Sequence, residues 1–396
     1  MKENIKPAIV AVAYNRPASL KRLLDSIGKA WYEESDILLI ISIDYSRDNS
    51  EVVKVAENFW WKYGEKKIVT HTNNLGLRRH ILECGNYAVK YGAAIILEDD
   101  LVVAPDFYGY AKSAQNFYCG EERIAGVALY SHEWNGYARK RFMPVLGNGD
   151  VYFGQFSVTW GQCWTGKQWS DFISWYKENQ ELHIQNNMPA SICDWSVNSW
   201  GKYFVYYIIA KNKYYVMPYH ALSTCFSEAG VHTNNISLDN QVRLQYGIKK
   251  YQFVGFEDGV HYDIFFENMD MGRFLKKATG DEKDICVNLY GLKSRDMEKK
   301  YRYILTTKKR RGKMIRSFAR QMRPIEMNII YDIPGDEIFL YENSECTGKR
   351  KVDVFRKLNY EAQGMPWQEA LYYGLIRAIY GAGMIIEAWL KNGKKR

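Results

Sequence analysis

The chain has 396 residues, a length that allows about two to three domains with large buried cores. Hydrophobic residues make up 47% and charged residues 25%, which are globular values and exclude a disordered or collagen-like chain. The net charge of +9 is uneven: residues 293–324 hold 13 Lys and Arg against two acids, so the remainder carries about −2.

The first 120 residues alternate strand and helix patterns. Wholly apolar runs are typical of strands buried on both faces, and Pro17 suits the first turn of a helix. Such alternation predicts parallel βαβ units, whose crossovers bring the carboxyl ends of the strands to one ligand-binding edge. Strands are predicted at Ala8 to Ala13, Asp36 to Asp44, Lys67 to Thr70 and Ala93 to Leu97, with helices near Pro17, Ser50 and Ile81.

The middle third of the chain, about residues 120–260, is less regular and rich in Trp. Apolar side chains at helical spacing predict one helix around Trp169 and a second from Trp195 to Ile209, before a strand from Tyr214 to Tyr219. Aromatic residues reach 15% of the chain, with 31 tyrosines. This high aromatic content suits either an aromatic core or surfaces that stack on bases or sugar rings.

The last third contains the basic block (residues 293–324), a short β-like stretch and a helix predicted from about Pro366. The basic block suits anionic lipid, a diphosphate substrate or nucleic acid, or it is a solvated helix face. Nucleic acid is the weakest of these, because no nucleic-acid module accompanies the charge. The terminal helix either lies on a membrane or docks as a structural helix.

The seven cysteines are scattered, with neither a CxxC pair nor zinc-type spacing to histidines. We interpret them as reduced thiols in a cytosolic protein. The first residues lack a signal-peptide pattern, and no apolar run approaches the ~18 residues of a spanning helix. These features predict a cytoplasmic protein, with peripheral contact at the inner face of the cell membrane through the basic block as an alternative.

Three consecutive acids, Glu98, Asp99 and Asp100, directly follow the fourth strand. Neighbouring carboxylates repel one another, so a cation is expected among them, and a divalent Mg²⁺ or Mn²⁺ bridging to substrate phosphates fits. The alternative is a solvated acidic turn. Asp44 ends the second strand at the same edge, and Arg16 follows the first, where it offers a phosphate or base contact. Neither a GxGxxG nor a GxxxxGK[ST] motif is present.

Four segments together resemble nucleotide-sugar glycosyltransferases of the GT-A fold. They read AVAYNRP, ISIDYS, NLGLRRHILECGNYAV and LEDDLVVAPDFYGY. More narrowly, they resemble bacterial family 2 enzymes related to the N-acetylglucosaminyltransferase I group, in which EDD stands for the DxD motif. The resemblance implies an α/β GT-A domain with a nucleotide-sugar-binding half at 1–120 and an acceptor-binding and catalytic half at 121–260. Residues 261–396 then form a basic and helical C-terminal extension.

The resemblance also implies roles for the residues that match its motifs. Asp100 would be the metal ligand, and Glu98 and Asp99 would shape the site near the ribose or sugar. The remaining donor-site residues are Asp44 for the uracil or ribose, Tyr14, Asn15 and Arg16 for the nucleotide, and Arg79 for the diphosphate unless it is a surface arginine.

An inverting enzyme of this family needs one carboxylate base, and Asp194 is the acid that matches best. Asp194 precedes the helix predicted from Trp195, where a helix N-terminus would keep it ionised, although a plain N-cap Asp would lie in the same place. Asp171 and Glu228 are the alternates. The family's second Asp and flanking Trp are not reproduced here.

Two further segments resemble loops around the donor. His232 lies in a Gly-Val-His loop like the one that closes over the diphosphate, or is an exposed loop histidine. Trp160 and Trp164 flank a Gly-containing turn like the one that lines the sugar and acceptor, or are packed in the core.

Together these features predict a metal-dependent, inverting transfer of a hexose or N-acetylhexosamine from a UDP-sugar to a glycan hydroxyl. The acceptor belongs to a surface or capsular polysaccharide and is either free or lipid-linked. Nucleic acid is not an expected partner. The alternatives are a sugar-1-phosphate nucleotidyltransferase, which should have a Gly-rich loop after the first strand, and a non-catalytic carbohydrate-binding protein.

Overall fold

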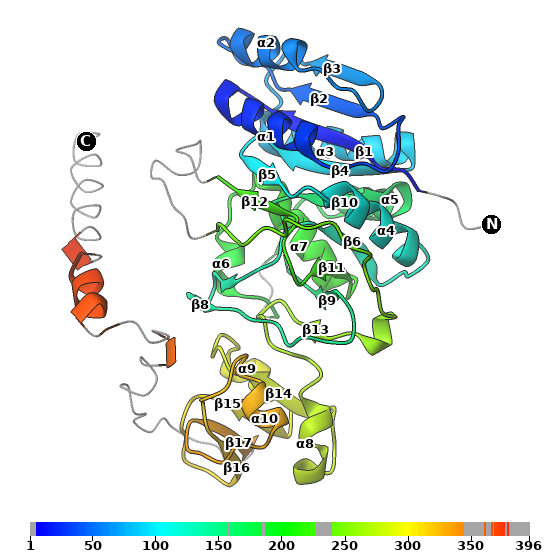
Figure 1. The fold of residues 1–396 in the computed structure, drawn as a ribbon. Helices are drawn as coiled ribbons and strands as arrows, with labels where there is room; N and C mark the ends of the chain where they lie inside the picture. The colour runs from blue at the N-terminus through cyan, green and yellow to red at the C-terminus, as the bar shows by residue number, and fades with distance from the viewer. Residues whose placement is uncertain are drawn as a thin grey trace.

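The computed structural model describes residues 5–156, 158–183, 187–226 and 240–343, and near the C-terminus residues 360–361, 366, 368–376 and 378–379. A nine-stranded sheet forms its centre (Figure 1), and five of its eight strand pairs are parallel. In spatial order the strands are β13 (His261–Tyr262), β9 (Val151–Gly154), β11 (Tyr214–Pro218), β6 (Ile124–Ala128), β10 (Gln162–Thr165), β4 (Ala93–Glu98), β1 (Ala8–Ala13), β2 (Leu39–Ile43) and β3 (Lys66–Thr70).

Helices cover both faces of this sheet. Alternate residues of β1 contribute to two separate cores, with Ile9 and Ala11 in one and Val10 and Val12 in the other. A strand buried on both faces must be apolar throughout, which explains its sequence. One core contains α1 (Pro17–Lys29), α2 (Ser50–Asn58) and α4 (Phe107–Tyr118), and the other contains α3 (Gly76–Tyr91), α5 (Gly166–Glu178) and α7 (Trp200–Ala210).

This architecture confirms the predicted α/β fold, a mostly parallel sheet with flanking helices, consistent with GT-A. The predicted strands and helices of the first 120 residues are all present. The helix predicted from Trp195 is wrong at its start, because α7 begins at Trp200 with Ser199 as its N-cap. The residues before it form the short helix α6 (Ala190–Cys193) and a turn.

Two short ribbons and one 3₁₀ turn lie beside the main sheet. β5 (Leu101–Val103) directly follows the acid triplet and pairs antiparallel with β12 (Ser223–Cys225). This pairing brings the chain before residue 227 close to the end of β4. The others are β7 (Trp134–Asn135) with β8 (Lys140–Arg141), and η1 (Phe256–Asp258).

The C-terminal unit, residues 271–343, is built around a second sheet with its own apolar core (Figure 1). The predicted basic and helical extension therefore contains a small β-sheet as well. The division of the chain at residues 120 and 260 stays a prediction. The elements are α8 (Gly272–Thr279), β14 (Ile285–Asn288), α9 (Arg295–Glu298), β15 (Tyr303–Thr306), β16 (Met314–Phe318), α10 (Met327–Ile330) and β17 (Ile338–Glu342), with sheet order β14-β15-β17-β16.

The basic block belongs to this unit and forms the short helix α9 and the strands β15 and β16, so its interpretation as one solvated helix face is wrong. Many of its cations form ion pairs with acids, most of which lie outside the block in the sequence. Lys293 contacts Asp263 at 2.5 Å, and Arg310 contacts Glu298 at 2.7 Å. Further pairs are Lys309 with Asp336, Lys313 with Glu342 and Arg316 with Asp332. A charge counted along the sequence thus overstates the charge available to a membrane.

Glu298 and Arg310 form the most buried of these ion pairs, with side chains 2% and 9% exposed. We expect Glu298→Ala to destabilise the C-terminal unit by about 3–5 kcal/mol, because it removes the carboxylate that pairs with the buried Arg310 guanidinium. Asp336→Ala breaks a more exposed pair and should cost about 0–1 kcal/mol. Urea unfolding at neutral pH measures both, and equal costs would contradict the prediction.

The same pair should make stability fall in acid. Burial alone would raise the pKa of Glu298, but hydrogen bonds from Arg310 and Asn288 bring it below the usual value of 4.5. The contribution is therefore complete above about pH 4.5 and is lost as the pH falls through the lowered pKa.

Beyond this unit, residues 368–376 and 378–379 are helical, as predicted for the chain after Pro366. Leu371, Tyr372 and Tyr373 are exposed on it. Among the described helices, none is both long and apolar enough to cross a bilayer.

Candidate functional site

The acid triplet and Arg16 meet at the carboxyl edge of the sheet. β4 and β1 are neighbours, so the residues that follow them emerge side by side. The Arg16 guanidinium forms an ion pair with Asp99, which is 3% exposed, and lies 3.7 Å from Asp100 Oδ2. Three carboxyl groups thus share one arginine, which leaves an excess of negative charge.

Burial and mutual repulsion disfavour the ionised acids. Burial, assisted by Asp100 and Asp99, raises the pKa of Glu98 well above its usual value. Burial also raises the pKa of Asp99 to about 6, although the Arg16 charge and a hydrogen bond from the Tyr14 backbone oppose this shift. Positive charge delivered to this edge would therefore be strongly favoured.

Asp44 follows β2 and holds the start of α3. Its carboxylate accepts hydrogen bonds from the backbone N–H groups of Tyr45, Leu75 and Gly76, at 2.8, 2.8 and 3.0 Å. Gly76 has a φ of +72°, a conformation that favours glycine. A carboxylate has about four acceptor positions, so Asp44 has little capacity left for a ligand. A contact to uracil or ribose stays a prediction beside this structural role.

Asp194 is exposed and stands at the C-terminal end of α6, not at the start of α7. Neither the stabilisation by a helix N-terminus nor the N-cap alternative therefore applies to it. The turn around it is nevertheless anchored. Lys202 Nζ donates to the carbonyls of Cys193 and Trp195, each at 2.7 Å, and so brackets Asp194.

Two further contacts involve this turn and the start of α7, one with α3 and one with the acid edge. Arg78 of α3 donates to the Val197 carbonyl and to the Tyr203 hydroxyl, both at 2.8 Å. Trp200, the first residue of α7, interacts with the Glu98 carboxylate and favours its charged form. The turn that carries Asp194 is thus connected to β4 through Trp200.

The two tryptophans predicted to stack on sugars have different surroundings. Trp160 is half-buried, with its ring 4.7 Å from that of Tyr130, and its carbonyl accepts a hydrogen bond from Ser223. Trp164 is fully buried, with its ring 4.6 Å from Trp169, and donates to the Tyr215 hydroxyl at 3.2 Å. The structure therefore places Trp164 in the core, where a sugar cannot reach its ring.

The other predicted residues are distributed as follows. Tyr14 lies at the site through its backbone, and Asn15 is exposed next to it. Arg79 is 71% exposed and pairs with Glu83 on its own helix, as a surface arginine does. Asp171, an alternate base, pairs with Lys167 on the surface of α5. His232 and Glu228 lie outside the described residues.

The carboxylate oxygens at the end of β4 fit a divalent cation that is held jointly by the protein and a bound ligand. The described residues contain no group of three or more His, Cys, Asp or Glu side chains able to hold a metal by themselves. Carboxylate oxygens beside an expected diphosphate are, however, the ligands that Mg²⁺ takes when it binds through one or two carboxylates plus substrate phosphates and water.

Sequence patterns did not point to Arg78, Lys202 and Trp200. Arg78 differs from Arg79 only by its position on α3, and Lys202 is a buried lysine inside an aromatic helix. The available signal for Lys202 was a lysine among the apolar residues of a predicted helix, because a buried lysine side chain requires polar partners.

Comparison with known proteins gives a family match over part of the chain. Residues 8–167, less than half of the chain, match the family model described as glycosyl transferase family 2. No curated protein sequence matches the chain. The family match does not single out the N-acetylglucosaminyltransferase I group, so the narrower resemblance stays a prediction.

Several solved structures are weakly similar. They include S. aureus TarS 1–349 in complex with UDP (15% identity over 55% of this chain and 60% of that chain, TM-score 0.34). They also include GalNAc-T7 with UDP, GalNAc and Mn²⁺ (14% identity over 55% of this chain and 43% of that chain, TM-score 0.37). A third is the mannosyltransferase PcManGT from Pyrobaculum calidifontis with GDP-Man and Mn²⁺ (13% identity over 40% of this chain and 45% of that chain, TM-score 0.28). The chain spans less than two thirds of each, and likenesses this weak transfer no residue's role.

Proposed function

We propose that the chain is a glycosyltransferase that moves a sugar, either a hexose or an N-acetylhexosamine, from a UDP-sugar to a hydroxyl group of a glycan acceptor. The supporting observation is the acid triplet at the end of β4, paired with Arg16 at the carboxyl edge of a mostly parallel sheet. The match of residues 8–167 to glycosyl transferase family 2 covers this edge. In this proposal residues 1–120 bind the donor and residues 121–260 bind the acceptor.

Asp100 is the residue proposed to hold Mn²⁺ or Mg²⁺ against the donor diphosphate, with Glu98 and Asp99 beside the ribose or sugar. When bound, the metal would neutralise the charge that builds on the leaving nucleoside diphosphate. Arg16 keeps Asp99 oriented, and it offers donors to a phosphate oxygen when the ligand enters.

Asp194 is the proposed base. The acceptor oxygen would form a bond to the anomeric carbon while the bond from that carbon to the diphosphate breaks. The hydroxyl proton passes to the Asp194 carboxylate, and the configuration inverts. The support for this assignment is the anchored turn, since Lys202 and Arg78 fix the backbone on both sides of Asp194.

Lys202 should therefore act as a positioning residue. We expect Lys202→Met to lower kcat about 10-fold to 100-fold and leave KM for the donor within about twofold, because a misplaced base slows the chemical step alone. Lys211→Met, at the exposed end of the same helix, is the matched control. Steady-state kinetics that show an unchanged kcat for Lys202→Met would contradict this role.

The acceptor is proposed to belong to a surface or capsular polysaccharide, free or lipid-linked, with the enzyme in the cytoplasm or at the inner face of the membrane. The test of the function is a screen of UDP-sugars with Mn²⁺ and Mg²⁺, following UDP release in the presence of candidate glycans. Acceptor-dependent release supports the proposal. Consumption of UTP with a sugar 1-phosphate, and no transfer, would instead support the nucleotidyltransferase alternative.

A further inference from the structure

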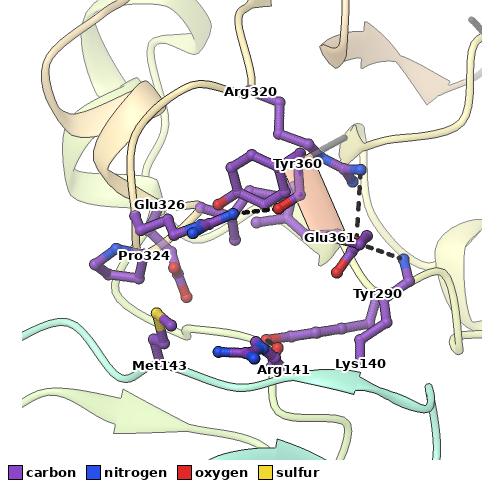
Figure 2. A pocket seen from close by; sticks show the side chains of 12 residues that line it. Lys140, Arg141, Met143, Tyr290, Arg320, Pro324, Glu326, Tyr360 and Glu361 are labelled. Atoms are coloured by element: carbon purple, nitrogen blue, oxygen red, sulfur yellow. Dashed lines mark hydrogen bonds and ion pairs between the residues drawn. The ribbon is translucent and has the colours of Figure 1, made fainter. Parts of the chain in front are cut away.

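A basic cavity lies between β8 and the C-terminal unit, away from the acid triplet. Figure 2 shows Lys140 and Arg141 on one side of it and Arg320 on the other. Arg323 also lines it. The cavity measures about 40 Å³, which is more than the roughly 10–15 Å³ that one water requires and far less than the roughly 300 Å³ of a pocket for a whole ligand. It has room for one small polar group.

Arg320 is a buried cation with an unmet donor. Its side chain is only 4% exposed, and its Nε–H has no acceptor among the described residues. A buried donor without a partner costs free energy, and more so on a charged group. The backbone N–H of Arg320 donates to Glu337 at 3.0 Å, which fixes the residue at the cavity wall.

The chain itself places an anionic group in this cavity. Glu361 Oε1 lies 3.8 Å from Arg320 Nη1 and 3.9 Å from Lys140 Nζ, which are ion-pair distances and too long for hydrogen bonds. The ring of Tyr360 lies 5.4 Å from the Arg320 guanidinium and 4.9 Å from that of Arg323. Arg323 Nη2 donates to the carbonyl of Tyr360, whereas the Arg320 Nε–H has no acceptor among the described residues, so the surroundings attract negative charge beside Arg320.

Glu326 does not cancel this attraction. Burial raises the pKa of this residue to about 7, so a large fraction is neutral near pH 7. Its Oε1 accepts a hydrogen bond from the Tyr262 hydroxyl at 3.3 Å, and its Oε2 has no partner among the described residues. Among the described residues that line the cavity, four cations thus face two carboxyl groups, one of which is often uncharged.

We propose that this cavity binds a phosphate group. A tetrahedral phosphate offers oxygens in several directions and can meet guanidinium groups from both walls, whereas a carboxylate has only two oxygens in one plane. On the proposed transferase function, the phosphate is carried by the acceptor. Figure 1 shows α6, which precedes Asp194, and β8 on the same side of the ribbon.

The test uses the full chain and calorimetric titration with inorganic phosphate and with glycerol 3-phosphate. Arg323→Gln and Arg141→Gln, tested singly, should each weaken binding at least about tenfold. Arg243→Gln removes a cation whose side chain is 86% exposed and should leave binding unchanged. Absence of phosphate binding by the wild type, or equal binding by all variants, would overturn the proposal.

Two additions separate the sources of the phosphate and the two proposals. Vesicles of phosphatidylglycerol, compared with phosphatidylcholine, report a lipid phosphate if their binding is lost in Arg323→Gln. If Arg323→Gln loses binding of inorganic phosphate and glycerol 3-phosphate but not of the vesicles, the site is assigned to a phosphate on a soluble acceptor. UDP binding is measured in the same samples: its absence in the wild type would remove the transferase function, while phosphate binding that depends on Arg323 would still establish the cavity as a phosphate site.

Discussion

Replacement of Asp194 by Asn is expected to lower kcat for sugar transfer by about 10²-fold to 10⁴-fold, the usual contribution of a general base. Asn has nearly the same shape but cannot accept the hydroxyl proton. Because Asp194 is exposed and its turn is held by backbone contacts from Lys202 and Arg78, the fold should be unaffected. UDP binding should also be unchanged, since the proposed donor site uses other residues.

Asp171→Asn is the matched control for this experiment. Asp171 is an acid of the same type on α5, where it pairs with Lys167 in solvent, and its removal should leave kcat within about twofold. Steady-state rates of UDP release measure both variants. Full activity of Asp194→Asn would refute the assignment of the base, and loss of activity in Asp171→Asn alone would move that role to Asp171.

Replacement of Trp164 by Ala should destabilise the protein by about 3–5 kcal/mol, as the truncation of a buried Trp usually does. Its ring packs against Trp169 and Phe204, and its indole N–H bonds to Tyr215. The substitution would leave both a cavity and a buried hydroxyl without its donor. Denaturant unfolding measures the loss.

Trp160→Ala provides the comparison, because Trp160 is half-buried and retains an accessible surface. Its stability cost should be smaller, and a rise in KM for the donor or the acceptor is expected if its ring contacts a sugar. The opposite pattern, a stable Trp164→Ala variant with a raised KM, would contradict the placement of Trp164 in the core.

The sequence was sufficient for the fold of the first 120 residues because local and global signals agree there. Strands such as β1 are apolar on both faces and alternate with helices, and Pro17 indicates the first turn of α1. The convergence of Arg16 with the acids after β4 also follows from topology alone, since parallel neighbours end at the same edge.

The start of α7 was mispredicted because several residues compete as its N-cap. Asp194, Ser196, Asn198 and Ser199 are all good N-cap types, and nothing local decides among them. Trp164 was ambiguous for a related reason. All four residues of β10 are buried, so alternation along the strand does not separate a core ring from one that lines a site.

The basic block was misread because its partners are distant in sequence. Lys293 pairs with Asp263, which is 30 positions earlier, and Lys313 pairs with Glu342, 29 positions later. Such pairs depend on tertiary structure, and a count of charges in one window cannot include them.

The most direct test of the central claim is calorimetric titration of UDP, with and without Mn²⁺, into the wild type and Asp100→Ala. Asp25→Ala, an exposed acid paired with Lys21, is the control. We predict UDP binding that Mn²⁺ strengthens in the wild type and the control, and loss of that metal dependence in Asp100→Ala. UDP binding that is absent in the wild type, or that is the same with and without Mn²⁺ in all three proteins, would contradict the proposed metal-assisted donor site.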